Sequence, residues 1–177
     1  MNNAGKKYDI ILWNILKLKE GMRVFMGTTV FATVLSGVVV FIAGQIILKI
    51  IIEPLSEYKA LKSKISYSLV FYANMYSNPM ENTKDFKENS DAVKQTNEAG
   101  FYLRNLAAEF SGWLQVMPIY KFFSFIRVIP SRKDADKVRG CLIGLSNGLT
   151  CSNRSMDSII IGNYERKQEI YKILKLH

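Results

Sequence analysis

The most prominent feature of the hydrophobic pattern is a run of twenty-five uncharged residues between Arg23 and Lys49. At about 1.5 Å per residue, a helix over this run would reach roughly 37 Å, which exceeds the ~30 Å hydrocarbon layer of a bilayer. The run starts too far into the chain, and is too long, for the apolar region of a cleaved signal peptide. We therefore expect a retained transmembrane helix over residues 24–52, although a buried core helix would also be apolar on all sides.

Residues 1–23 predict an amphipathic segment that lies at the membrane interface. Ile11, Ile15 and Leu18 share one helical face, and Tyr8 and Trp13 are aromatic types that favour the level of the lipid headgroups. Gly21 offers a bend between this segment and the span.

Apolar residues recur at helical spacing through the rest of the chain, which predicts helices over about 55–77, 92–116, 132–149 and 156–176. Ser131 and Asp134 resemble a capping box at the start of the third of these helices. Residues 78–90 read as a polar loop, and residues 119–130 as a short apolar segment that other helices or neighbouring subunits must cover. The expected inward positions include Tyr58, Leu61, Ile65, Leu69, Tyr72, Tyr76, Phe101, Leu106, Phe110, Trp113, Leu114, Val138, Cys141, Leu142, Leu145 and Leu149. The predicted fold is all-α: one N-terminal transmembrane helix followed by a helical bundle over residues 53–177.

Small and polar residues within the uncharged run fall on one stripe, formed by Thr29, Thr33, Ser36, Gly37 and Gly44. Such a stripe is typical of close packing between membrane helices. It would equally suit the wall of a water-filled pore in a ring of helices. In the bundle, Gly140, Gly144 and Gly148 recur every four residues and predict a second close approach.

The formal net charge is +9, and both the span region and the remainder are basic. Membrane orientation therefore cannot be inferred from charge, and attraction to anionic lipid is one explanation of the excess, with nucleic-acid binding as the other. Cys141 and Cys151 are too far apart along one helix to form a disulfide, which favours a reducing compartment and a cytosolic bundle.

Recognisable catalytic chemistry is sparse in this sequence. The single histidine, His177, is the last residue, and the sequence contains no spacing typical of a metal site, a nucleotide-binding loop or a catalytic triad. We expect no catalytic residue, no metal and no cofactor, and therefore a protein that is not an enzyme.

Three stretches carry a resemblance to a known family: IIEPLSEYKAL, ISYSLVFYANMYSNP and RGCLIGLSNGL, in this order after the span. The chain resembles small bacterial membrane proteins with a HEPN-like helical domain, and more narrowly the accessory membrane proteins of type VI-B CRISPR loci. This resemblance implies a ring-shaped homo-oligomer in the bacterial inner membrane, with the 53–177 domain in the cytoplasm. The ring would form a pore that depolarises the cell and strengthens antiphage defence when an RNA-guided ribonuclease finds its target.

Active HEPN ribonucleases pair an arginine with a histidine that follows after four to six intervening residues. Counting from Arg139, that place is taken here by Ser146 and Asn147, neither of which titrates near neutral pH. We expect these three residues to form a degenerate polar cluster that holds helices together. Asn153 and Arg154, before the last helix, are candidates for a pocket or subunit contact, or for ordinary capping.

The sequence thus predicts an oligomeric pore. Two alternatives stay open: a membrane-tethered ribonuclease that uses the Arg139 region, and a one-span scaffold that recruits a nucleic-acid-bound partner to lipid.

Overall fold

The structure, a computed structural model, describes residues 3–81, 83, 86, 88–151 and 155–176. The chain divides into two compact units, Met1–Lys49 and Ile50–His177. Helices dominate both units, and the described residues include only one pair of two-residue strands, which confirms the all-α prediction. The predicted boundary between span and bundle, at residues 52 and 53, lies three residues from the observed division.

The first unit consists of a single helix, α1 (Asn3–Ile47). Its backbone is helical through Gly21, so the predicted bend between an interfacial segment and a span does not occur there. A glycine permits a bend but does not impose one, and within a helix it weakens the structure by only about 1 kcal/mol. Near the start, the Nζ of Lys17 lies 4.2 Å from the centre of the Trp13 ring.

A π-helix, Leu48–Ile52, follows α1 along the chain and precedes α2 (Glu53–Phe71). Pro54 explains this local change, because proline has no N–H to donate to the carbonyl four residues earlier and its ring crowds that carbonyl. A single widened turn with longer hydrogen-bond spacing relieves this crowding.

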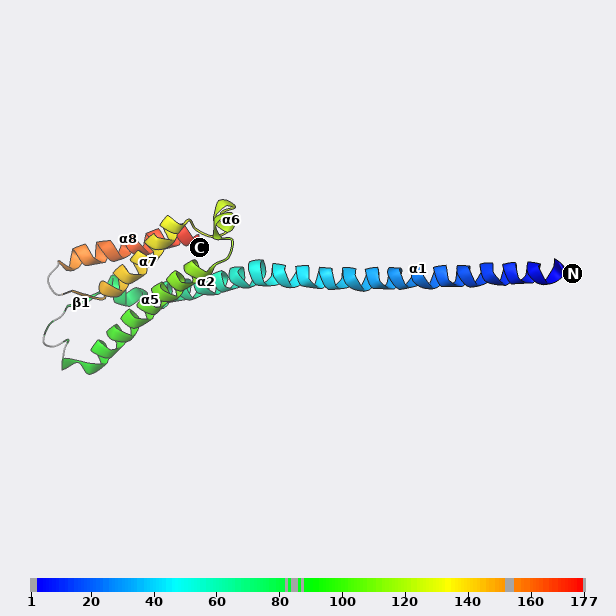
Figure 1. Ribbon diagram of the computed structural model, residues 1–177. Helices are drawn as coiled ribbons and strands as arrows, with labels where there is room; N and C mark the ends of the chain where they lie inside the picture. Colours follow the sequence, from blue (N-terminus) through cyan, green and yellow to red (C-terminus); the bar gives the residue numbers. More distant parts are fainter. Residues whose placement is uncertain (1–2, 82, 84–85, 87, 152–154, 177) are drawn as a thin grey trace. The chain divides into compact units, whose positions relative to one another are not determined.

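The second unit is a helical bundle (Figure 1). Besides α2 it contains α3 (Ala73–Ser77), α5 (Ser90–Val116), α6 (Tyr120–Phe125), α7 (Arg132–Asn147) and α8 (Met156–Leu174). Helix α7 packs between α5 and α8, while α2 packs on α5 and α3 packs on α8. The fully buried core comprises Ile65, Leu69, Tyr76, Leu103, Phe110, Val138, Leu142, Leu145 and Ile170.

Most of the predicted inward positions are buried, and Phe101 is the clearest exception. Its side chain is 63% exposed, whereas Gly100 and Leu103 on the same helix face the core. The contact between α5 and α7 explains the difference, because the small residue Gly100 lets Ser146 approach and turns Phe101 outward. Tyr72 and Cys141 are only half-buried, and Tyr72 lies at the break between α2 and α3.

The predicted loop over residues 78–90 contains a strand that the sequence did not reveal. Strand β1 (Met80–Glu81) pairs in parallel with β2 (Thr150–Cys151), and the Met80 N–H donates to the Leu149 carbonyl at 2.9 Å. Two residues are too few to show the alternation that identifies a strand in a sequence.

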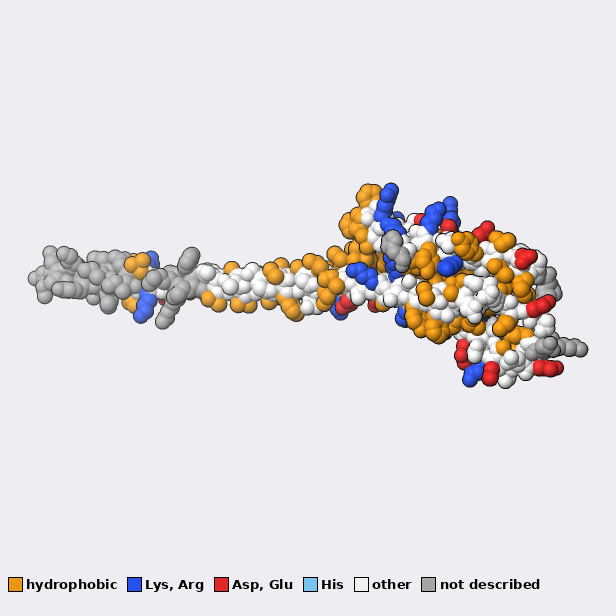
Figure 2. Space-filling view, turned by 180° about the vertical axis from the view of Figure 1, so that it is seen from behind, with side chains coloured by type: hydrophobic (Ala, Val, Ile, Leu, Met, Phe, Trp, Pro, Cys, Tyr) orange, Lys and Arg blue, Asp and Glu red, His pale blue; other side chains and the backbone are white. Residues whose placement is uncertain are grey.

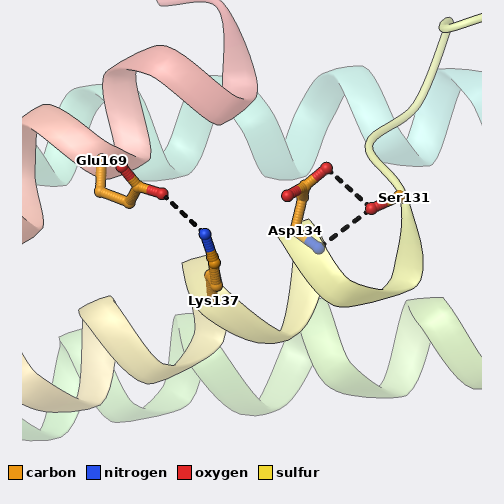
Figure 3. A network of polar contacts seen from close by, with 4 residues as sticks. All are labelled: Ser131, Asp134, Lys137 and Glu169. Carbon is orange, nitrogen blue, oxygen red and sulfur yellow. Dashed lines mark hydrogen bonds and ion pairs between the residues drawn. The ribbon is translucent and has the colours of Figure 1, made fainter.

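Helix α7 begins as predicted at Arg132, with Ser131 as its N-cap (Figure 3). The Asp134 N–H donates to the Ser131 hydroxyl oxygen at 3.1 Å, and this hydroxyl donates to the Asp134 carboxylate at 2.7 Å. The carboxylate therefore accepts from the hydroxyl rather than from a backbone amide. Helix α7 ends at Asn147, two residues before the predicted end, with Gly148 as its C-cap.

Two of the three glycines predicted to allow close packing, Gly144 and Gly148, do so. The groups that pack against them are side chains of α8 and not the backbone of another helix. At Gly148 a β carbon would lie 2.8 Å from the Cγ of Asn163, and at Gly144 it would lie 2.6 Å from the Cδ of Arg166. Gly140 has nothing within 4 Å of that position.

Asn163 on α8 is the polar centre of this packing and is fully buried. Its amide nitrogen donates to the carbonyls of Tyr76 and Gly148, both at 2.8 Å, and its amide oxygen accepts from Arg166 at 3.2 Å. One side chain thus joins the ends of α3 and α7 to α8.

We predict that Gly148→Ala lowers the free energy of unfolding by about 1–3 kcal/mol, because the new methyl group displaces the Asn163 amide. Gly140→Ala is the matched control on the same helix. It should be neutral or stabilise the protein by up to about 1 kcal/mol, since alanine favours helix and this site is open. Chemical denaturation of the full chain in detergent, followed by near-ultraviolet circular dichroism, would compare them. Equal effects of both substitutions would contradict the packing described here.

Candidate functional site

The first candidate site is the apolar part of α1. Among the described residues, one helix is long and apolar enough to cross a membrane, starting at Thr28. Its most apolar stretch of eighteen residues has a mean hydropathy of 2.4, and none of these residues is buried within the protein. By length and composition, this helix could therefore lie in lipid.

The predicted stripe of Thr29, Thr33, Ser36, Gly37 and Gly44 lies within about 100° of helical arc, since each residue advances ~100°. Neither Gly37 nor Gly44 has any atom within 4 Å of its open Cβ position. Outside this arc lie large side chains such as Phe31, Leu35 and Ile42, each at least half exposed. Val40 and Ile47 also fall within this arc, so the small residues share the narrow face with two large side chains, whereas the broad face is mostly bulky.

Two of the hydroxyl groups on the stripe are bonded within the helix itself. Thr33 donates to the Thr29 carbonyl at 2.9 Å, and Ser36 donates to the Thr33 carbonyl at 2.8 Å. Such bonds satisfy the hydroxyl protons without water or a partner helix. Each oxygen can still accept a hydrogen bond from outside.

The second candidate site is a cleft between α5 and α7 in the bundle, with a volume of about 220 Å³. Ser146 lies at its base and donates to the Gly100 carbonyl at 2.9 Å. At the rim, a guanidinium N–H of Arg104 donates to the Asn147 side-chain oxygen at 3.0 Å. Thr96, Asn97, Phe101, Leu149 and Thr150 complete the described lining.

The structure brings Ser146 and Asn147 together in this cleft but places Arg139 elsewhere. Arg139 is exposed and pairs with Asp136 on its own helix at 3.2 Å. Arg104 on α5 occupies the role that sequence spacing assigned to Arg139. A count along one helix could not reveal it, because Arg104 lies on a different helix.

Arg104 is the only ionisable side chain among the described residues that line the cleft. Acid-base cleavage of RNA uses a group that exchanges protons near neutral pH, and arginine does not. The prediction that the chain is not an enzyme stays a prediction. Asn153 and Arg154 lie outside the described residues; the next residue, Ser155, is the N-cap of α8.

Several ionisable groups in the bundle have raised pKa values. Burial raises the pKa of the Cys141 thiol above its ordinary value, and burial raises the pKa of Tyr58 and of Tyr76 to about 12. Cys141 and Cys151 are both free thiols, as predicted. Within the described part of the chain, no group of three His, Cys, Asp or Glu residues could hold a metal ion.

We predict that Ser146→Ala lowers the free energy of unfolding by about 1 kcal/mol, because a buried hydrogen bond between α5 and α7 is lost. Arg139→Ala should change it by less than about 0.5 kcal/mol, since an exposed ion pair within one helix contributes little. Denaturation of both variants in detergent tests the comparison. If Arg139→Ala is the more destabilising, the polar cluster includes Arg139 after all.

Comparisons of this chain with protein families, with curated proteins and with solved structures find no match.

Proposed function

We propose that this chain is a single-pass membrane protein whose copies associate in a ring and open a pore. The observation that carries the proposal is a narrow face of α1 on which small and hydroxyl residues gather, interrupted by Val40 and Ile47, beside a broad and mostly bulky apolar face. Large aliphatic side chains suit lipid, whereas small residues allow helices to approach closely. A ring of such helices would place Thr29, Thr33 and Ser36 at helix contacts or toward a lumen.

The hydroxyl bonds within α1 support this proposal. Thr33 and Ser36 already donate to carbonyls of their own helix, so the single helix can enter lipid before it finds partners. Their oxygens keep acceptor capacity, which water in a lumen or a neighbouring helix could use. The same stripe therefore suits both the inserted monomer and the assembled ring.

An exposed aromatic surface on the bundle supports self-association of the second unit. Tyr67 and Phe71 of α2 stack with ring centres 5.3 Å apart, and both are more than half exposed. Phe71 also contacts Tyr72, which lies beside Tyr102 of α5. Contiguous exposed aromatic rings of this kind are typical of protein interfaces.

The resemblance to HEPN-like accessory proteins supplies the biological setting of the proposal. In this setting the ring lies in the bacterial inner membrane with the bundle in the cytoplasm, where the two free thiols would stay reduced. Opening would follow target recognition by an RNA-guided CRISPR ribonuclease, and depolarisation would then strengthen defence against phage. The proposal requires no direct contact between the bundle and nucleic acid.

We predict that Gly37→Leu lowers the rate of dye release from vesicles about tenfold, because the added side chain keeps neighbouring helices apart. Val38→Leu is the matched control, since it adds bulk on the opposite face of α1, where lipid is expected. Mass measurement in detergent should show rings for the Val38 variant and smaller species for the Gly37 variant.

A wild-type protein that is monomeric in detergent and releases no dye would contradict the pore. RNA cleavage that is lost in Arg104→Ala would instead favour the tethered ribonuclease. A partner that co-purifies in the absence of both activities would favour the scaffold.

A further inference from the structure

Helix α6 and its flanking residues expose an unusually apolar surface. Phe122 and Phe125 are 54% and 84% exposed, and Ile119, Ile126 and Val128 are each close to half exposed. Tyr120 and Phe123 of the same short helix are buried in the bundle. The segment of residues 119–128, called the α6 segment below, therefore has an anchored side and an outer apolar side.

The backbone holds this outer side away from the bundle. Ile119 and Arg127, one at each end of α6, adopt left-handed conformations with φ of 49° and 59°. A β-branched residue such as Ile119 rarely adopts this conformation, so the surrounding contacts must maintain it. One such contact is the Tyr120 hydroxyl, which donates to the Pro130 carbonyl at 2.7 Å.

A cationic groove of about 500 Å³ lies beside the α6 segment. Its lining includes five cations, namely Lys62, Arg127, Lys137, Lys172 and Lys175, and only two carboxylates, Asp134 and Glu169. Both carboxylates are already engaged, Asp134 by Ser131 and Glu169 by Lys137 at 3.4 Å (Figure 3). The groove therefore retains an excess of positive charge.

The space-filling view places these features together on the second unit. The apolar protrusion formed by α6 is flanked by lysine and arginine side chains, whereas most acidic side chains gather toward the other end of the bundle (Figure 2). An apolar tip beside cations is the pattern of surfaces that bind at a membrane interface.

The α6 segment also lies close to the point where the chain enters the bundle. Trp113 donates from its indole N–H to the Pro54 carbonyl at 3.2 Å, and its ring stacks on Tyr58 at 5.0 Å. Tyr120 of α6 lies beside the same ring, with centres 6.5 Å apart. Pro54 is the sixth residue after Leu48, the last residue of the uncharged run, which gives a reach of at most about 20 Å. If the uncharged run lies in a bilayer, the α6 segment is within reach of its surface.

We propose that the α6 segment and the cationic groove together dock on anionic phospholipid. Phe122, Phe125 and Ile126 enter the boundary between headgroups and acyl chains. The groove cations, Arg127 and Lys172 among them, bind the lipid phosphate groups. This inference rests on the membrane span of the proposed function but not on the pore.

A second copy of the chain is a weaker candidate for the occupant of this surface. A symmetric contact between two copies would bring two cationic grooves together, and like charges would oppose the association. Anionic lipid offers the opposite charge and an apolar layer at the same time.

The experiment compares the full chain in nanodiscs of phosphatidylcholine alone with nanodiscs that also contain phosphatidylglycerol, by hydrogen exchange and mass spectrometry. We expect the amides of residues 119–128 to exchange more slowly in the anionic discs. In the Phe122→Ser/Phe125→Ser variant, whose changed side chains are exposed, this protection should disappear. Lys172→Gln should weaken it about fivefold, the effect expected for one cation near an anionic surface.

Two matched controls separate this docking from general effects. Phe101→Ser changes a phenylalanine on α5 whose exposure lies between those of Phe122 and Phe125, and Lys94→Gln removes an exposed lysine near the start of α5. Both should leave the protection of residues 119–128 unchanged.

Equal exchange in the two kinds of disc would overturn the proposal. So would protection in detergent that increases with protein concentration, because a second copy would then cover the segment. Two separate results test the proposed function. The absence of dye release would contradict the pore, and a chain that does not enter the nanodiscs would contradict the membrane span.

Discussion

The behaviour of the whole protein depends on how the apolar part of helix α1 is covered, because no other described part of the protein packs against it. From Thr28 to Leu48 the side chains of α1 and the following turn are exposed, although most are apolar. In water this surface would be unfavourable by about 25 cal/mol for each Å² of apolar area, so another solvent must cover it. The bundle, in contrast, buries its own core and satisfies its buried polar side chains within the described residues. The two units therefore differ in what must cover their apolar surfaces. The apolar surface of α1 needs lipid or partner helices, whereas the bundle buries its own core and leaves only part of its outer surface apolar.

Hydrophobic periodicity predicted the helices of the bundle well, because burial of one face is what holds each helix in place. Ile65, Leu69, Val138, Leu142 and Leu145 are all fully buried, as their spacing predicted. The errors occur where a tertiary contact overrides the pattern. Phe101 turns outward because Gly100 lets α7 approach α5, and the β1–β2 pair forms between segments too short to carry a period. Neither feature is encoded in the local sequence that surrounds it.

The polar cluster predicted from Arg139, Ser146 and Asn147 also shows that local sequence does not reveal contacts between helices. The positions of Ser146 and Asn147 could be predicted because a motif spacing along one helix marked them, and both do lie in the α5–α7 cleft. The cation that bonds to Asn147, Arg104, is forty-three residues away from it and could be recognised only from the packing of the two helices. Arg139 had the expected spacing, yet its position on α7 leaves it exposed beside Asp136. Spacing within an element identifies neighbours on that element and says little about the helix that packs across from it.

The hydroxyl bonds within α1 bear on the order of assembly. If Thr33 and Ser36 had no acceptor in their own helix, insertion of a single helix into lipid would leave two polar protons unsatisfied, and partners would be needed at once. With both protons bonded to backbone carbonyls, the proposed insertion and the proposed association would be separate steps. Association in the proposed ring would then depend on the weaker contribution of close packing at Gly37 and Gly44, and the ring would form or dissociate without a large barrier. The proposed pore, which would stay closed until a signal arrives, requires this separation, because strong obligatory contacts in the membrane would hold it permanently in one state.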